Sequence, residues 1–148
     1  MMHRVLVSFF CLVLLTACEP TNFEDLKGNK GHFSNFKGDW LVINYWASWC
    51  KPCLIEIPEL NTLDQQHPNI RVFAVNFDQL SPEELAPEAQ AMGIEFTVLL
   101  QDPVTAFGYP RPTRLPTTVL INPNGKVTEI REGLQTEADL LAAMGLPH

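Results

Sequence analysis

The chain reads WLVINYWASWCKPC from Trp40 to Cys53, and this segment joins an apolar run to a pair of cysteines. The run Trp40–Trp46 is apolar at nearly every position and does not alternate, which is typical of a strand buried on both faces of a helix-covered sheet. Cys50 and Cys53 follow where the strand is expected to turn into a helix. Two thiols at this spacing can close and reopen a disulfide across one helical turn, so the pair predicts a redox centre.

The two sulfurs are expected to have different roles. The predicted helix runs from about Cys50 to Gln65, and Pro52 fits its first turn, where a missing N–H costs little. The partial positive charge of the helix N-terminus and the nearby charge of Lys51 favour the thiolate form of Cys50. We therefore expect Cys50 to be the nucleophile and the more exposed of the two sulfurs, and Cys53, one turn later, to be the more buried resolving thiol.

Similar patterns predict the rest of the domain. Ser81 is expected to cap a second helix that Pro87 interrupts and Gly93 ends, and Thr136 to cap a last helix that stops at Gly145. The order of elements predicts an α/β domain with a mixed sheet. Further strands are expected at 70–76, 96–100, 117–121 and 126–131, with brief strands near 23–26 and 32–33.

The N-terminal residues are expected to form a targeting signal rather than part of the folded domain. An apolar run at 5–15 is too short to span a bilayer and ends in Leu-Thr-Ala before Cys18. This pattern resembles the bacterial lipoprotein signal, in which that Cys is lipidated. In Gram-negative lipoproteins an Asp at the next position resembles an inner-membrane retention signal, so Glu19 at that position favours the outer membrane if the cell is Gram-negative. A plain signal peptide or an uncleaved anchor are the alternatives. We expect a signal peptide at 1–17, a tether and lead-in at 18–38, and the domain at 39–148.

The length, net charge and cysteine count of the chain limit the classes of function that it can have. The chain has 148 residues, enough for one domain with a core, and a formal net charge of −7, which argues against nucleic acid as a partner. Of its four cysteines, Cys11 would leave with the signal peptide and Cys18 would carry lipid. The remaining pair would then work outside the cytoplasm, where disulfides persist.

Two other uses of the cysteine pair are considered. A zinc site needs two further ligands, and no second cysteine pair or paired histidines are present, so no metal is expected. A static structural bridge stays open, although a three-residue spacing closes too small a loop to constrain the unfolded chain strongly.

Two motifs together resemble one family. The segment WASWCKPCLIEIP, residues 46–58, resembles the active-site segment of thioredoxin-fold proteins of the TlpA/ResA type, which are extracytoplasmic, membrane-tethered thiol-disulfide oxidoreductases. LPTT at 115–118, followed by NPNG at 122–125, is similar to their cis-proline strand and hairpin. The resemblance covers roughly 40–144 and implies a thioredoxin-like α/β fold, a mixed central sheet flanked by helices.

The resemblance also implies roles for individual residues. Pro116 would be a cis-proline facing Cys50, and the backbone beside it, at Leu115, would pair with an extended substrate peptide. Glu56 would handle protons at the thiols, since Asn44, where cytoplasmic thioredoxins carry a buried Asp, cannot act as a base. The expected substrate-binding residues are Trp49, Lys51, Pro52, Leu115 and Pro116. Trp46 is expected in the core and Glu59 in solvent.

The expected activity is thiol-disulfide exchange without a cofactor beyond the Cys50–Cys53 disulfide. The resemblance to this family implies a reductase of protein disulfides, which a membrane electron-donor protein returns to the reduced state. The alternatives are an oxidase or isomerase, a non-catalytic binding lipoprotein, or a Cu(I) carrier. Arg111 and Arg114 are expected in a solvated, irregular loop over 102–114, and an acidic partner is their alternative role.

Overall fold

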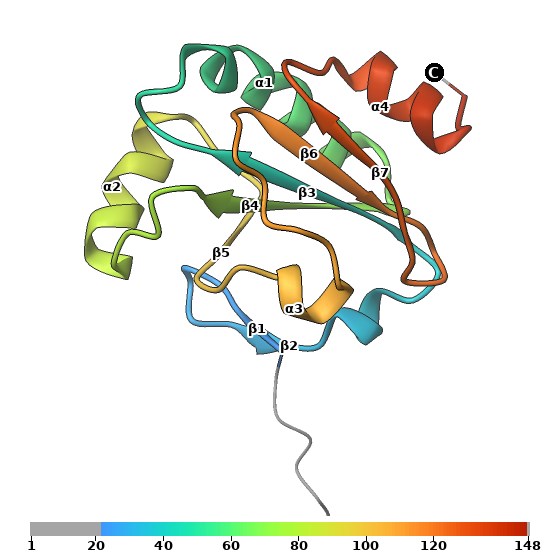
Figure 1. Ribbon diagram of the computed structural model, residues 1–148, viewed down its shortest axis with the longest axis horizontal. Helices are drawn as coiled ribbons and strands as arrows, with labels where there is room; N and C mark the ends of the chain where they lie inside the picture. Colours follow the sequence, from blue (N-terminus) through green and yellow to red (C-terminus); the bar gives the residue numbers. More distant parts are fainter. Residues whose placement is uncertain (1–21, 148) are drawn as a thin grey trace, which may run out of the picture.

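A five-stranded mixed sheet forms the centre of the computed structural model, which describes residues 22–147 (Figure 1). In spatial order the strands are β5 (Thr97–Leu99), β4 (Ile70–Asn76), β3 (Trp40–Trp46), β6 (Thr117–Ile121) and β7 (Val127–Glu132). Strands β3 and β4 pair in parallel, as do β4 and β5, whereas β6 runs antiparallel to both β3 and β7. The predicted bounds of β3, β4 and β6 are confirmed.

Both faces of the sheet are covered (Figure 1). One face packs against α1 (Lys51–Gln66), α2 (Pro82–Ala91) and α4 (Glu137–Met144). The other face packs against a 3₁₀ helix η1 (Phe33–Phe36), the short helix α3 (Val104–Phe107) and the hairpin β1 (Phe23–Glu24) and β2 (Lys30–Gly31). No helix within residues 22–147 is long and apolar enough to cross a membrane.

The central strand β3 explains why its sequence is apolar throughout. Successive side chains of a strand point to opposite faces. Val42 and Trp46 enter the core under α1, α2 and α4, whereas Ile43 and Tyr45 enter the core under η1 and α3. Trp46 is fully buried, which confirms its predicted place in the core.

The helix caps follow the predicted signals. Ser81 and Glu84 form a capping box at the start of α2, and Thr136 and Asp139 form another at the start of α4. Each box satisfies backbone N–H groups that the first turn leaves free. Gly145 ends α4 in the left-handed conformation at φ 70°, which glycine adopts without steric cost.

The predicted interruption at Pro87 is wrong, because α2 continues through it to Ala91. The proline removes one backbone hydrogen bond, whose acceptor would be the carbonyl of Glu83. Both residues are exposed, so water can hydrate that carbonyl, and Leu85 and Ala89 still bury the apolar side of the helix.

Two segments predicted as irregular or extended differ in detail. The strand expected at 32–33 is displaced to β2, and Phe33 instead begins η1. The segment 102–114 contains the short helix α3, which ends at Gly108 with φ 70°.

The described part of the lead-in packs on the sheet. The ring centroid of Phe23 lies 5.0 Å from that of Phe33 and 6.0 Å from that of Phe73 on β4. A β-bridge also joins Asp25 to Leu99 at the edge of β5. The predicted signal peptide, and Cys18, lie outside the described residues.

Candidate active site

The two cysteines form a disulfide at the N-terminus of α1. The Cys50–Cys53 bond has an S–S distance of 2.04 Å. Cys50 is the N-cap residue of α1, and its sulfur accepts a hydrogen bond from the backbone N–H of Cys53 at 3.3 Å. Such N–H groups and the helix dipole stabilise a negative sulfur at this position. Cys50 retains 4% of its surface exposed and Cys53 none.

The turn that presents the pair comes directly from the central strand. β3 ends at Trp46, and the carbonyl of Ala47 accepts the N–H of Cys50 at 3.1 Å, so the chain turns within three residues. Lys51 and Pro52 then occupy the exposed first turn of α1. The redox pair therefore lies at the carboxyl end of β3, the edge where α/β sheets place their ligand sites.

Leu115 and Pro116 lie at the same edge of the sheet. Their peptide bond is cis, as the resemblance implies. Thr117 pairs with Tyr45 at the end of β3, which places Pro116 beside the strand end that leads to Cys50. Leu115 packs against the core that contains both cysteines. Within residues 22–147, neither the N–H nor the carbonyl of Leu115 has a backbone partner, whereas the carbonyl of Pro116 accepts the N–H of Gly133.

Glu56 is buried one turn after Cys53 on the inner side of α1. It has no exposed surface, and its two carboxyl oxygens accept hydrogen bonds from Asn44 Nδ2 and from the backbone N–H of Gln135, the latter at 3.1 Å. Burial raises the pKa of Glu56 to about 7, because desolvation outweighs the opposite effect of the hydrogen bonds from Gln135 and Asn44. This carboxyl group is therefore partly protonated near neutral pH.

Trp49 borders the redox pair as an exposed side chain. Its indole is 63% exposed, and its Nε1 donates to Asp78 Oδ2 at 2.8 Å. The ring of Phe77 meets the indole edge-to-face at a centroid distance of 6.4 Å. Leu54 and Ile55 on α1 are also large exposed apolar side chains, so an apolar surface lies within five residues of Cys50.

Three charged residues near the site differ from or refine the sequence-based expectation. Arg111 is not in a solvated loop, because its guanidinium group pairs with Asp102 and packs on Phe77. Glu59 is half-buried rather than solvent-facing, and it accepts the backbone N–H of Glu137 at 3.0 Å. Arg114 is exposed, as expected, and pairs with Glu132 at 3.1 Å.

Sequence reasoning did not single out Phe77 and Asp78. Both directly follow β4, which runs parallel to β3, so they come to the same edge of the sheet as Cys50. Residues after the carboxyl ends of adjacent parallel strands are candidates for any α/β site, and that rule could have identified them.

Comparison with known proteins identifies the family. A model of the AhpC/TSA family matches residues 16–130. The chain belongs to this family. It is 32% identical over 120 residues to the thiol-disulfide oxidoreductase ResA of Geobacillus kaustophilus, a match that covers 78% of this chain and 67% of the relative. It is 30% identical to ResA of Bacillus subtilis over 125 residues, which cover 83% of this chain and 69% of that relative.

This family member is a thiol-disulfide oxidoreductase with Cys50 and Cys53 as its Cys-x-x-Cys pair, which confirms the resemblance to ResA-type proteins. Its fold is similar to the crystal structure of a thiol:disulfide interchange protein, a thioredoxin family protein from Chlorobium tepidum. That match has a TM-score of 0.66 and 24% identity, and covers 85% of this chain and 92% of the other. The predicted thioredoxin-like fold is confirmed.

Proposed function

We propose that this protein is an extracytoplasmic, lipid-anchored reductase of protein disulfides, recharged by a membrane electron-donor protein. The observation that carries the proposal is the position of Cys50, whose sulfur caps α1 and accepts the N–H of Cys53. A sulfur held by the helix N-terminus is stabilised as a thiolate, the form that attacks a disulfide.

The proposed reaction uses the two sulfurs in sequence. In the reduced enzyme the Cys50 thiolate attacks one sulfur of a partner disulfide, which forms a mixed disulfide and releases the other partner sulfur as a thiolate. Cys53 then loses its proton and attacks the Cys50 sulfur. The partner leaves with both cysteines reduced, and the enzyme is left with the Cys50–Cys53 disulfide. Two electrons have passed from enzyme to partner, and the electron donor restores them.

Glu56 is proposed to accept the proton that Cys53 releases. It lies one turn after Cys53 on α1, and both residues are fully buried, so water has little access to either group. Because its pKa is about 7, a substantial fraction of Glu56 is ionised at neutral pH and able to take up a proton. Asn44 and Gln135 hold the carboxyl group in place through their hydrogen bonds.

The surface around Cys50 supports a protein as the substrate. Trp49, Leu54 and Ile55 supply exposed apolar contact area, and large apolar side chains of this kind are typical anchors of protein interfaces. On the other side, the N–H and carbonyl of Leu115 have no backbone partner among the described residues 22–147, and they could pair with an extended peptide, as in strand addition. We therefore infer a substrate groove between Trp49 and the Leu115–Pro116 segment.

The Cys53→Ala variant tests this function. Reduced Cys53→Ala should attack a partner disulfide through Cys50 and remain attached, because no second thiol resolves the mixed disulfide. Incubation of the pre-reduced, desalted variant with extracytoplasmic proteins should give adducts that appear on non-reducing gels and disappear with dithiothreitol.

The matched controls are Cys50→Ala in the same extract and Cys53→Ala in an extract that has been reduced and alkylated. Neither should give adducts. Absence of adducts with Cys53→Ala in the untreated extract would contradict disulfide reduction and favour a binding protein without turnover.

The anchor is proposed from the segment that precedes the described residues. Lipidation of Cys18 would hold the chain at a bacterial membrane, the outer membrane if the cell is Gram-negative, and more than one acyl chain is needed for stable binding. The Cys18→Ser variant should therefore move from the membrane fraction to the soluble fraction, whereas Cys11→Ser should stay in the membrane fraction. Equal distribution of Cys18→Ser and the wild type would contradict the anchor.

A further inference from the structure

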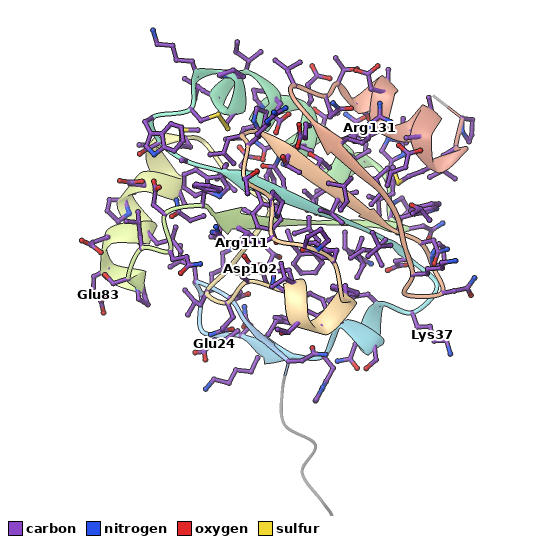
Figure 2. The ribbon with its side chains drawn as sticks, viewed as in Figure 1. Glu24, Lys37, Glu83, Asp102, Arg111 and Arg131 are labelled. Carbon is purple, nitrogen blue, oxygen red and sulfur yellow. A yellow bond between two sulfur atoms is a disulfide. The ribbon has the colours of Figure 1, made fainter. Side chains whose placement is uncertain are left out.

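Arg111 joins two segments that lie far apart in the sequence, and one of them, the turn after β4, contacts Trp49 beside the redox pair. Its Nε donates to Asp102 Oδ2 at 2.9 Å, and its Nη2 donates to the carbonyl of Phe77 at 2.7 Å. The guanidinium carbon lies 4.8 Å from the centroid of the Phe77 ring. Figure 2 shows Arg111 and Asp102 next to each other, between the sheet and α3. The side chain of Arg111 therefore fastens the turn after β4 to the segment after β5.

The Phe77 end of this connection reaches the edge of the substrate groove. Phe77 packs edge-to-face on Trp49, and the next residue, Asp78, accepts the indole N–H. Asp78 is itself held, since its backbone N–H donates to Asn76 Oδ1 at 3.0 Å. The orientation of the exposed indole therefore depends on a two-residue turn, and Arg111 packs on that turn and binds its backbone.

The Asp102 end is held by the core. Asp102 Oδ1 accepts the hydroxyl of Tyr45 at 2.6 Å and the backbone N–H of Val104 at 3.2 Å. Tyr45 is fully buried in β3, and its hydroxyl also bonds to that of Tyr109 at 2.9 Å. Arg111 thus binds a carboxylate whose own position is determined by the central strand.

Arg111 also belongs to the segment that leads to the other side of the groove. It precedes Leu115 by four residues, and Pro112 restricts the backbone between them. The Trp49 indole on one side of the groove therefore depends on the Arg111 side chain through Phe77 and Asp78, and the Leu115–Pro116 segment on the other side is joined to Arg111 by three intervening residues of backbone. We propose that Arg111 is a positioning residue that sets the spacing of these two sides, and so determines how well an extended protein substrate fits. This inference rests on the proposed function, because the groove is defined by it.

The guanidinium group suits this role better than an ammonium group would. Its planar fork can donate to a carboxylate and to a carbonyl at once while its face stacks on an aromatic ring. A lysine at position 111 would carry a compact charge on a flexible stem and would lack the planar face that stacks on the Phe77 ring.

The test compares Arg111→Met and Arg111→Lys with the wild type, using insulin as a protein disulfide and dithiobis(nitrobenzoate) as a small one. We expect Arg111→Met to raise KM for insulin about fivefold. The kcat for insulin and the rate with the small disulfide should stay within about twofold of wild type, because the sulfurs are not moved. Arg111→Lys should give an intermediate KM, and it provides the test if Arg111→Met does not fold.

A second readout does not depend on turnover. In protein labelled with 5-fluorotryptophan, the ¹⁹F resonance of Trp49, assigned by its loss in Trp49→Phe, should shift in Arg111→Met, whereas that of Trp40 should not. The matched control is Arg71→Met, which removes an exposed ion pair with Asp39 near the start of β4 and should change neither readout.

An unchanged KM, an equal loss of rate with both disulfides, or an unmoved Trp49 resonance would overturn the proposal. If the wild type itself reduces no insulin, the proposed function fails on that result, and the Trp49 resonance still decides whether Arg111 positions the indole.

Discussion

Replacing Cys50 with Ser should lower the steady-state rate of protein disulfide reduction by about 10³-fold or more, the scale on which removal of a catalytic nucleophile acts. The reason is geometric as well as chemical. Cys50 caps α1, where backbone N–H groups stabilise a thiolate, whereas Cys53 has no exposed surface. For Cys53 to attack a partner directly, the first turn of α1 would have to open locally, and such opening costs several kcal/mol.

Turnover of insulin with dithiothreitol as the electron source measures this effect. Cys53→Ser should also lose turnover, because the mixed disulfide is not resolved, but it should retain the first attack. A Cys50→Ser variant with more than about a tenth of the wild-type rate would show that another nucleophile carries the reaction.

Replacing Glu56 with Gln should remove a pH dependence of stability worth about 3 kcal/mol. The pKa of Glu56 rises from 4.5 to about 7 on folding, because burial disfavours its charged form. Between these values the folded state binds more protons than the unfolded state. The stabilisation that the raised pKa of Glu56 contributes to the folded state is therefore fully present below pH 4.5 and is lost as the pH rises through about 7. Gln resembles the protonated acid and does not titrate.

Denaturant unfolding of the oxidised proteins measures the effect. The difference in unfolding free energy between Glu56→Gln and the wild type should grow in favour of the variant by about 3 kcal/mol from pH 4.5 to pH 8. The matched control is Glu83→Gln on the exposed start of α2, which should follow the wild-type curve. Parallel curves for Glu56→Gln and the wild type would show that Glu56 titrates near its ordinary pKa, and proton transfer through it would then lose its basis.

Much of the fold could be predicted because the relevant signals are local. The bounds of β3 and β4 follow from largely apolar runs, and the starts of α2 and α4 follow from capping boxes. The cysteine pair could be placed at a strand-to-helix turn for the same reason. The continuation of α2 through Pro87 could not be predicted, because it depends on whether one backbone carbonyl faces water after folding.

The supporting contacts of the site could not be predicted from local patterns. Gln135 donates to Glu56 across 79 positions in the sequence, and Arg111 contacts Phe77 across 34. Such pairs depend on how loops at one edge of the sheet meet. Arg111 in a proline-rich stretch has the local signature of a solvated loop, and its half-buried place becomes visible once Asp102 and Phe77 are brought beside it.

In the proposed mechanism Cys50 attacks first, and the buried thiol of Cys53 then resolves the mixed disulfide. Single-turnover reaction of the pre-reduced proteins with dithiobis(nitrobenzoate) separates these two roles, because each thiol attack releases one coloured thiolate. Wild type should release two equivalents, and Cys53→Ser should release one at the wild-type rate of first attack. Cys50→Ser should react about 100-fold more slowly, since exposing the buried sulfur requires local opening. A fast equivalent from Cys50→Ser, or none from Cys53→Ser, would contradict this assignment of the two sulfurs.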